Sequence, residues 1–199
     1  MVRQEQSDYY GELEQMFITR VRGARSHEVL WTAELLAAAA DAEGRGAIVA
    51  LAAPGMSLCT IDPDVTAGAD LPPSADALIV QDPAEFSHAG IFAGLSPEAY
   101  LLVNSTCGFG DLGVGERVAR FCRDRALILP VARLQVGRHD AAACGGALLG
   151  GLAALTGAVS LDSVVSAVDR MSGIPPWACA EAAMAAYEFV RAEKQALAA

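Results

Sequence analysis

Short apolar runs alternate with amphipathic or polar stretches along most of the chain. Short, mainly apolar runs are typical of strands in a buried sheet, and they occur at 16–21, 47–53, 77–81, 99–104 and 126–131. The neutral segment 54–61 predicts a further strand at an edge of the sheet. Helical spacing of apolar residues predicts a helix that follows Val29 and stops at Gly44 and Gly46, and further helices at 114–125, 139–158, 161–171 and 175–195.

This alternation of strands and helices indicates how the chain is organised. It predicts a single three-layer α/β domain over 16–199, with a mainly parallel, Rossmann-like sheet, helices on both faces and C-terminal helices. Residues 1–15 form a polar arm without the features of a secretory signal. The stretch 61–76, rich in Pro and Asp, predicts a loop, and 84–96 predicts a weak helix or loop.

One segment is long enough to require a membrane check. No charged residue occurs from Ala141 to Leu161, which would suffice to span a bilayer. Ala and Gly dominate the segment, however, and such residues gain little in lipid. We expect a buried helix whose small residues let neighbouring elements approach closely.

Composition narrows the class of protein. The 199 residues carry a net charge of −10 and show no Lys/Arg stripe, which argues against a nucleic-acid partner. Apolar residues make up 53% of the chain and charged residues 19%. The apolar surplus is consistent with large partner contacts, and equally with a general bias towards Ala.

The cysteines argue against a cluster held by this chain alone. The chain has five, at positions 59, 107, 122, 144 and 179, and no two form a CxxC pair. Iron–sulfur and structural zinc sites need clustered ligands, so we expect no metal here and reduced thiols in a cytoplasmic protein. No catalytic triad is visible, and we assign no catalytic residue.

The turn after the first strand carries the strongest candidate site. Cationic and polar side chains gather just before a helix N-terminus, a position that favours anions or an acidic partner loop. The candidates are Arg20, Arg22, Gly23, Arg25, Ser26 and His27. The alternative is a solvated turn in which Ser26 caps the helix and Glu28 pairs locally. A dinucleotide site needs more glycines than Gly23 alone.

Other polar residues have simpler interpretations. Asp82 follows a buried strand and is read as a turn residue ahead of Pro83. Asn104 also ends a strand, and we expect its side chain to bond to the following turn, although it stays a candidate binding or interface residue. His139 is read as a capping-region residue, and Cys107 as an ordinary rather than a reactive thiol.

Two regions carry a family resemblance. The segment ITRVRGARSHEVLWTAELLAAAADAEG, 18–44, resembles a motif of the form I-x-G-R-G-G-Q-G-V-V-T-A-A-E-L-L-A, and GGALLGGLAALTGAVSLDSVVSAV, 145–168, resembles one with L-x-x-x-T-G-x-V-S-L-E-S-L. Both motifs belong to the gamma subunit, or gamma domain, of the 2-oxoacid:ferredoxin oxidoreductases. ADALIVQDPA, 75–84, and AYLLVNST, 99–106, match its strands, so the likeness runs from about 16 to 192.

The chain departs from the family in its loops. Gly23 falls on the first loop glycine, but 24–28 replace R-G-G-Q-G, the segment E-R-R-G-A-P-V has no counterpart, and Gly145 stands where the family often has Asn. Bulky residues cannot let the backbone approach a ligand as glycine does. A divergent or purely structural gamma subunit would account for these changes.

The resemblance implies a role inside a larger complex. The complex would oxidatively decarboxylate a 2-oxoacid, usually to an acyl-CoA, and pass electrons to ferredoxin or, through a flavin subunit, to NAD⁺. Thiamine diphosphate, Mg²⁺ and [4Fe–4S] clusters would lie in alpha, beta and delta-type subunits, and residues 22–28 would face a partner subunit or coenzyme A. Pyruvate, 2-oxoglutarate, branched-chain, oxalate and aryl substrates all stay open.

Two other hypotheses use the same residues. A stand-alone nucleotide- or CoA-binding α/β protein would bind its ligand as an isolated chain. An interaction module without such chemistry would be a stable soluble monomer.

Overall fold

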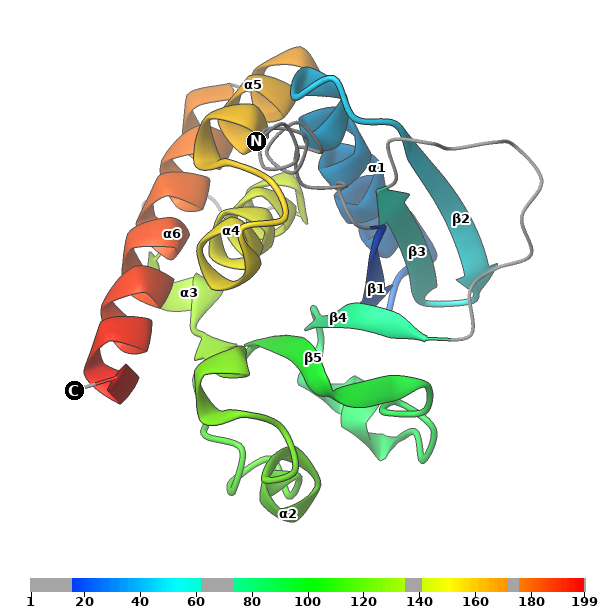
Figure 1. Ribbon diagram of the computed structural model, residues 1–199, viewed down its shortest axis with the longest axis vertical. Coiled ribbons are helices and arrows are strands. Elements are labelled where there is room, and N and C mark those ends of the chain that lie inside the picture. The colour runs from blue at the N-terminus through cyan, green and yellow to red at the C-terminus, as the bar shows by residue number, and fades with distance from the viewer. Residues whose placement is uncertain (1–15, 62–73, 135–140, 172–175, 199) are drawn as a thin grey trace, which may run out of the picture.

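Six strands form one sheet in the computed structural model, which describes residues 16–61, 74–134, 141–171 and 176–198 (Figure 1). The strands are β1 (Phe17–Arg22), β2 (Ala47–Ala53), β3 (Met56–Ile61), β4 (Ala75–Val80), β5 (Leu95–Asn104) and β6 (Ala126–Leu129). Their order is β2-β3-β1-β4-β5-β6. Neighbouring pairs from β1 to β6 are parallel, and β3 is antiparallel to both of its neighbours, which confirms the mainly parallel sheet.

The predicted position of segment 54–61 at the sheet edge is wrong. Gly55 has a φ of 67°, a left-handed conformation that reverses the chain directly after β2. The resulting hairpin folds β3 back between β2 and β1, and β2 therefore takes the edge. The predicted polar arm, 1–15, and most of the predicted loop 61–76 lie outside the described residues.

Each predicted helix is found, but the one predicted at 114–125 is much shorter. A short helix that was not predicted begins at Val131, the last residue of the strand predicted at 126–131. The helices are α1 (Ser26–Ala42), α2 (Gly115–Val118), α3 (Val131–Leu134), α4 (Ala141–Thr156), α5 (Leu161–Met171) and α6 (Pro176–Ala198), with single 3₁₀ turns at η1 (Pro83–Ser87) and η2 (Arg123–Arg125). The helix predicted at 114–125 shortens to α2. Beyond Val118 the Phe121 N–H donates to the Val118 carbonyl at 2.9 Å, a tighter turn that ends the α-helical bonding, and the Phe121 ring packs against Phe92 with 5.9 Å between centroids.

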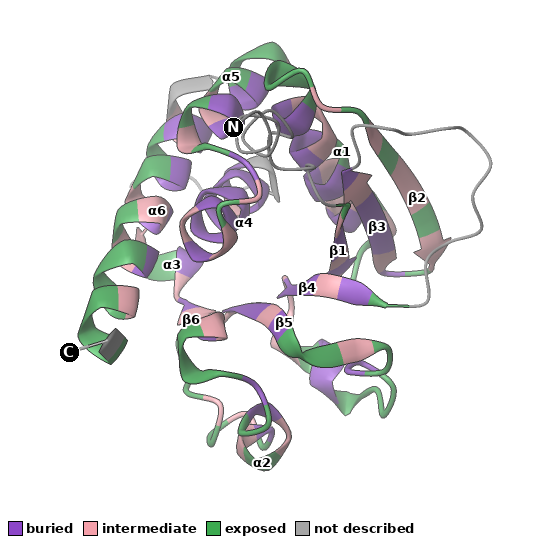
Figure 2. Ribbon diagram, viewed as in Figure 1, coloured by how far each residue is buried: buried purple, intermediate pink, exposed green. Residues whose placement is uncertain are grey.

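The helices lie in layers on the sheet (Figures 1 and 2). α1 and α4 cover one face, and α5 and α6 pack outside them. Alternate residues of β4 face opposite sides: Ile79 belongs to the cluster under α1 and α4, and Leu78 to a second cluster with Phe86 and Phe92. Among the described residues, the other face is covered by η1, α2 and their turns.

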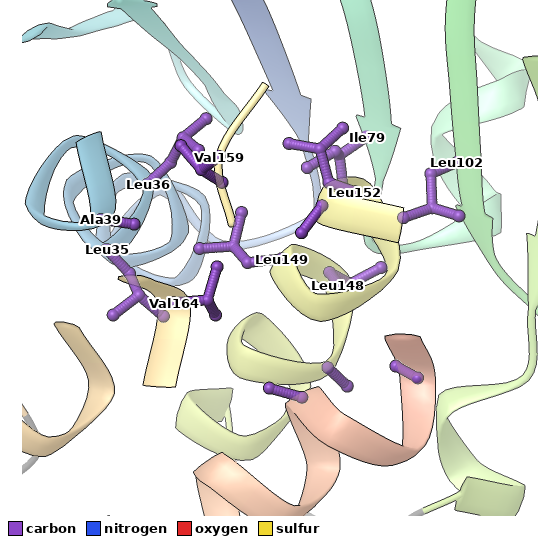
Figure 3. Close-up of a cluster of buried hydrophobic side chains, with 14 of the residues drawn as sticks. Leu35, Leu36, Ala39, Ile79, Leu102, Leu148, Leu149, Leu152, Val159 and Val164 are labelled. Carbon is purple, nitrogen blue, oxygen red and sulfur yellow. The ribbon is translucent and has the colours of Figure 1, made fainter. Parts of the chain in front are cut away.

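α4 is the central helix of the domain. Leu148, Leu149 and Leu152 are fully buried, and they lie between α1 and the sheet (Figure 3). A Cβ on Gly150 would stand 2.0 Å from the Ala183 carbonyl oxygen of α6, so glycine alone permits this close approach. The expectation of a buried helix is confirmed, and no helix within the described ranges is long and apolar enough to cross a bilayer.

Candidate functional site

A crevice opens where β1 and β4 lie side by side and the chain departs in opposite directions. From β1 it continues through α1 to the β2–β3 side, whereas from β4 it continues to β5 and β6. Ligand sites of open α/β sheets form at such a switch point, outside the carboxyl ends of the strands. The crevice has a volume of about 210 Å³ and is lined by Ala24, Arg25, Glu28, Gln81, Asp82 and Cys144.

Two glycines fix the backbone beside this crevice. The Gly23 N–H donates to the Gly55 carbonyl at 3.0 Å, and a Cβ on Gly55 would stand 2.3 Å from the Gly23 oxygen. The Ser26 hydroxyl accepts from the Gly55 N–H at 3.0 Å. The suggestion that Ser26 caps α1 is wrong: Ser26 is the first helical residue, and Arg25, with extended backbone, holds the cap position without a side-chain bond. The Ser26 hydroxyl bonds to the hairpin instead.

Gln81 joins three elements at the floor of the crevice. Its backbone N–H donates to the Arg22 carbonyl at 2.7 Å, and its Nε2 donates to the Thr32 hydroxyl at 2.5 Å. The Asn104 Nδ2 donates to the Gln81 carbonyl at 3.1 Å and lies 3.7 Å from the Cys144 sulfur. Asn104 thus bonds to the neighbouring strand end rather than to its own turn, which corrects the prediction, because parallel strands bring their carboxyl ends together.

The cationic residues predicted to act together are separated in space. The side chains of Arg20 and Arg22 lie on the face of β1 away from α1, where Arg22 forms a 2.7 Å ion pair with Glu85. Both partners of that pair are nearly buried, at 14% and 11% side-chain exposure. Arg25 instead lies at the crevice and pairs with Glu28 at 2.8 Å, which confirms the local pairing of Glu28.

His27 and Arg25 have the accessible side chains of this turn. The His27 side chain is 78% exposed, with its Nε2 3.9 Å from Glu28, and the Arg25 side chain is 69% exposed. Asp82 accepts the Ala84 N–H at 2.9 Å, as expected of a turn residue. His139 lies outside the described residues.

The chemistry of the crevice favours binding over reaction. Burial, together with the negative charge of Glu28, raises the pKa of the Cys144 thiol to about 11, so it stays protonated at neutral pH and is a poor nucleophile. No group of three or more His, Cys, Asp or Glu side chains within the described ranges is placed to hold a metal ion.

Sequence reasoning missed the residues that organise the site. Gln81 had an available signal, since it is a polar residue at the carboxyl end of a buried parallel strand. Glu85 and Cys144 carry no such signal in the sequence. Glu85 matters through its contact with Arg22, and Cys144 through its contact with Asn104, and both partners lie far away in the sequence.

Solved structures share this fold. A pyruvate oxidoreductase subunit, PORC, from Thermotoga maritima matches with a TM-score of 0.65 and 21% identity over 87% of this chain and 96% of its own. The gamma subunit of a keto/oxoacid ferredoxin oxidoreductase from Geobacter sulfurreducens PCA matches with a TM-score of 0.60 and 21% identity over 92% and 98%.

A third structure shows the same fold as part of a longer chain. It is the 2-oxoglutarate:ferredoxin oxidoreductase from Magnetococcus marinus with 2-oxoglutarate, coenzyme A and succinyl-CoA bound, with a TM-score of 0.61 and 15% identity over 92% of this chain and 31% of the other. No protein-family model and no curated protein matches the sequence. The chain thus has the fold of the gamma subunits of pyruvate and keto-acid ferredoxin oxidoreductases.

Proposed function

We propose that this chain is the gamma subunit of a cytoplasmic, multisubunit, thiamine-diphosphate-dependent 2-oxoacid oxidoreductase. The complex would decarboxylate a 2-oxoacid oxidatively, usually to an acyl-CoA, with electrons passing to ferredoxin or to NAD⁺. The observation that carries this proposal is the likeness of fold over 87–92% of the chain to subunits of such oxidoreductases.

The cofactors are proposed to lie in partner chains. Thiamine diphosphate, Mg²⁺ and [4Fe–4S] clusters would be held by alpha, beta and delta-type subunits, and this chain would shape the interface. Two features of the crevice support an interface role: its floor is occupied by the bonds of Gln81 and Asn104, and the Cys144 thiol is protonated.

The rim of the crevice is the proposed contact point for a partner or for coenzyme A. Gly23 and Ser26 hold the loop against the hairpin, which leaves Arg25 and His27 accessible to an anionic group. Drug-sized ligands usually need about 300 Å³ or more, so the 210 Å³ crevice fits part of a nucleotide rather than the whole. This volume argues against a nucleotide-binding protein that acts alone.

Strand β2 supplies a second argument for a partner. Its seven residues, AIVALAA, are all apolar, and none of them is buried. Ile48 and Leu51 are 39% and 49% exposed, and the strand is an edge of the sheet. Soluble proteins usually protect such an edge with charge or Pro, so an uncharged edge favours cover by another chain.

Deletion of the coding sequence in the native host tests the proposal. Extracts would be assayed for dye reduction that depends on pyruvate, 2-oxoglutarate, branched-chain, oxalate or aryl 2-oxoacids. We expect the deletion to abolish activity with one of these substrates, and the wild-type chain to restore it. Leu51→Lys should restore it poorly, whereas a matched change of an exposed α1 residue, Glu34→Lys, should restore it fully. Unchanged activity with every substrate would contradict the proposal.

A further inference from the structure

A second cavity lies on the face of the sheet away from α1. It has a volume of about 230 Å³ and is lined by Arg20, Arg22, Met56, His88, Gly90 and Ile91. Arg20 and Arg22 are two residues apart on β1, so their side chains emerge on the same face. Across β1 and β3, Arg22 is paired with Met56, which continues the cavity wall towards the hairpin.

The two arginines differ in their partners. Arg22 forms its ion pair with Glu85, while the Arg20 Nη1 donates to the carbonyl oxygen of Ala93 at 2.7 Å. No carboxylate of the described residues forms an ion pair with Arg20. Both Nε atoms are buried and have no acceptor. Burial and the neighbouring charge of Arg22 also lower the pKa of Arg20, as expected for a cation that lacks a counter-charge.

The local charge is unusual for this protein. The chain carries a net charge of −10, yet two guanidinium groups line this cavity, and Glu85, the ion-pair partner of Arg22, offsets one of them. One positive charge is left, with His88 counted as neutral. Arg20 is half-buried, and a charge that is partly removed from water gains stability from a partner of opposite charge. One monovalent anion would complete the pairing, and a planar carboxylate fits the fork geometry of arginine.

We propose that this cavity binds a carboxylate through Arg20, with Arg22 and His88 beside it. The carboxylate comes either from a free small acid or from an Asp or Glu side chain of a partner subunit. The free-acid source does not depend on the proposed function, whereas the partner source rests on it.

Nuclear magnetic resonance of the isolated full chain tests the site. The probe is sodium acetate, titrated against sodium chloride at equal ionic strength, and the signals are the arginine Nε–Hε pairs. We expect saturable shifts for Arg20 and Arg22 at millimolar acetate and none for Arg170, an exposed arginine of α5. Arg20→Gln should weaken acetate binding by about tenfold, which corresponds to one charge-assisted hydrogen bond.

A second variant keeps the test independent of any effect of Arg20→Gln on folding. Met56→Glu places a carboxylate on the cavity wall, so it should abolish the acetate response while both arginines are retained. Acetate shifts no larger than those of chloride, or an unchanged response in Met56→Glu, would overturn the proposal.

Co-purification from the native host distinguishes the two sources of the carboxylate. Loss of co-purified subunits from tagged Arg20→Gln identifies a partner side chain, and unchanged assembly together with acetate binding identifies a free acid. If the wild-type chain recovers no oxidoreductase subunit, the proposed function fails, while an acetate response in the isolated chain still supports the site.

Discussion

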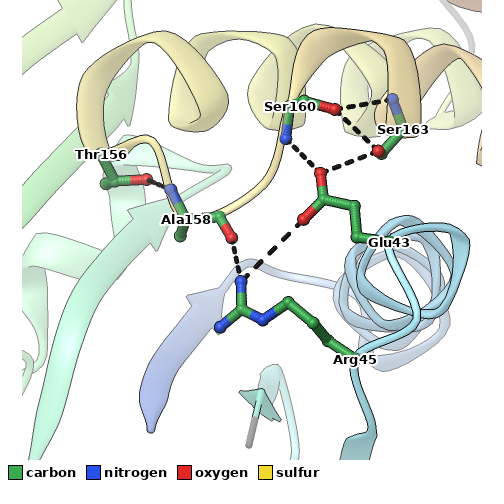
Figure 4. A network of polar contacts seen from close by, with 6 residues as sticks. All are labelled: Glu43, Arg45, Thr156, Ala158, Ser160 and Ser163. Atoms are coloured by element: carbon green, nitrogen blue, oxygen red, sulfur yellow. Dashed lines mark hydrogen bonds and ion pairs between the residues drawn. The ribbon is translucent and has the colours of Figure 1, made fainter. Parts of the chain in front are cut away.

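The carboxylate of Glu43, directly after α1, accepts a 2.7 Å hydrogen bond from the backbone N–H of Ser160, just before α5 (Figure 4). The same oxygen accepts from the Ser163 hydroxyl at 2.8 Å, while the Ser160 hydroxyl caps the helix by accepting the Ser163 N–H at 3.1 Å. Glu43 thus supports the capped start of a helix that begins more than a hundred residues later. Beside it, Arg45 donates to the Ala158 carbonyl at 2.6 Å. α1 and α5 are thus joined by charge-assisted bonds at one end.

Glu43→Gln should lower the free energy of unfolding by about 1–2 kcal/mol at pH 7, because a charged acceptor is replaced by a neutral one. Chemical denaturation measures the effect, and Glu34→Gln, on the exposed face of α1, serves as the control. An equal loss in both variants would contradict the capping role.

The effect should also depend on pH. Burial alone would raise the pKa of Glu43, but the bonds from Ser160 and Ser163 and the charge of Arg45 outweigh it and lower the pKa. A lowered pKa in the folded state means that the contribution is complete above the ordinary carboxyl pKa and is lost as pH falls through the folded one. The stability gap between wild type and Glu43→Gln should therefore narrow in acid.

Gly150→Ala tests the close contact between α4 and α6. The new Cβ would meet the carbonyl oxygen and carbon of Ala183 at 2.0 and 2.6 Å. These are backbone atoms of α6, so the clash can be relieved only if one helix shifts away from the other. We expect a loss of about 2–3 kcal/mol or more, seen as a lower denaturation midpoint. Gly110→Ala adds the same methyl group in open space and should stay within about 0.5 kcal/mol of wild type.

Arg22→Ala leaves Glu85 buried without its counter-charge, and it should cost about 3 kcal/mol of stability. Arg25→Ala removes an exposed arginine that lies directly before α1. It should change the free energy of unfolding by no more than about 0.5 kcal/mol. Adding Glu85→Gln to Arg22→Ala should restore part of the loss. If the double variant is no more stable than Arg22→Ala, the ion pair is not what holds this face together.

Cysteine alkylation tests the environment of the crevice. Burial raises the pKa of Cys59 to about 12, and burial with Glu28 raises that of Cys144 to about 11, while Cys107 and Cys122 are exposed. At pH 7.5 iodoacetamide should modify Cys107 and Cys122 well before the other two, as followed by peptide mass spectrometry. Urea should remove the difference, and rapid labelling of Cys144 in the folded chain would contradict the buried thiol.

Local pattern was sufficient to predict most elements. Apolar runs identified the parallel strands, and the glycines of 145–151 correctly indicated close helix packing. The order of β2 and β3 could not be predicted, because a hairpin and two separate strands share the same local pattern. α2 was predicted too long, because the tight turn in which the Phe121 N–H bonds to the Val118 carbonyl leaves no mark on the apolar spacing of 114–125.

The site was predicted less completely than the fold. The turn after β1 was found, but Arg22 is the last residue of β1 and pairs with Glu85 on the face away from α1, whereas Arg25 lies beyond the strand, at the crevice. This separation depends on where β1 ends and on which face Arg22 leaves. Gly145 has a structural reason that the sequence alone did not give: a Cβ there would stand 2.6 Å from the Trp31 ring and 2.8 Å from the Thr32 hydroxyl. The Trp31 ring thus takes space that a larger residue at 145 would need.

Purification of the tagged chain from its native host tests the gamma-subunit proposal most directly. The proposal predicts stoichiometric recovery of a thiamine-diphosphate subunit and a ferredoxin-like subunit, with the brown colour of iron–sulfur clusters. Recovery of a colourless, soluble chain without partners would contradict it.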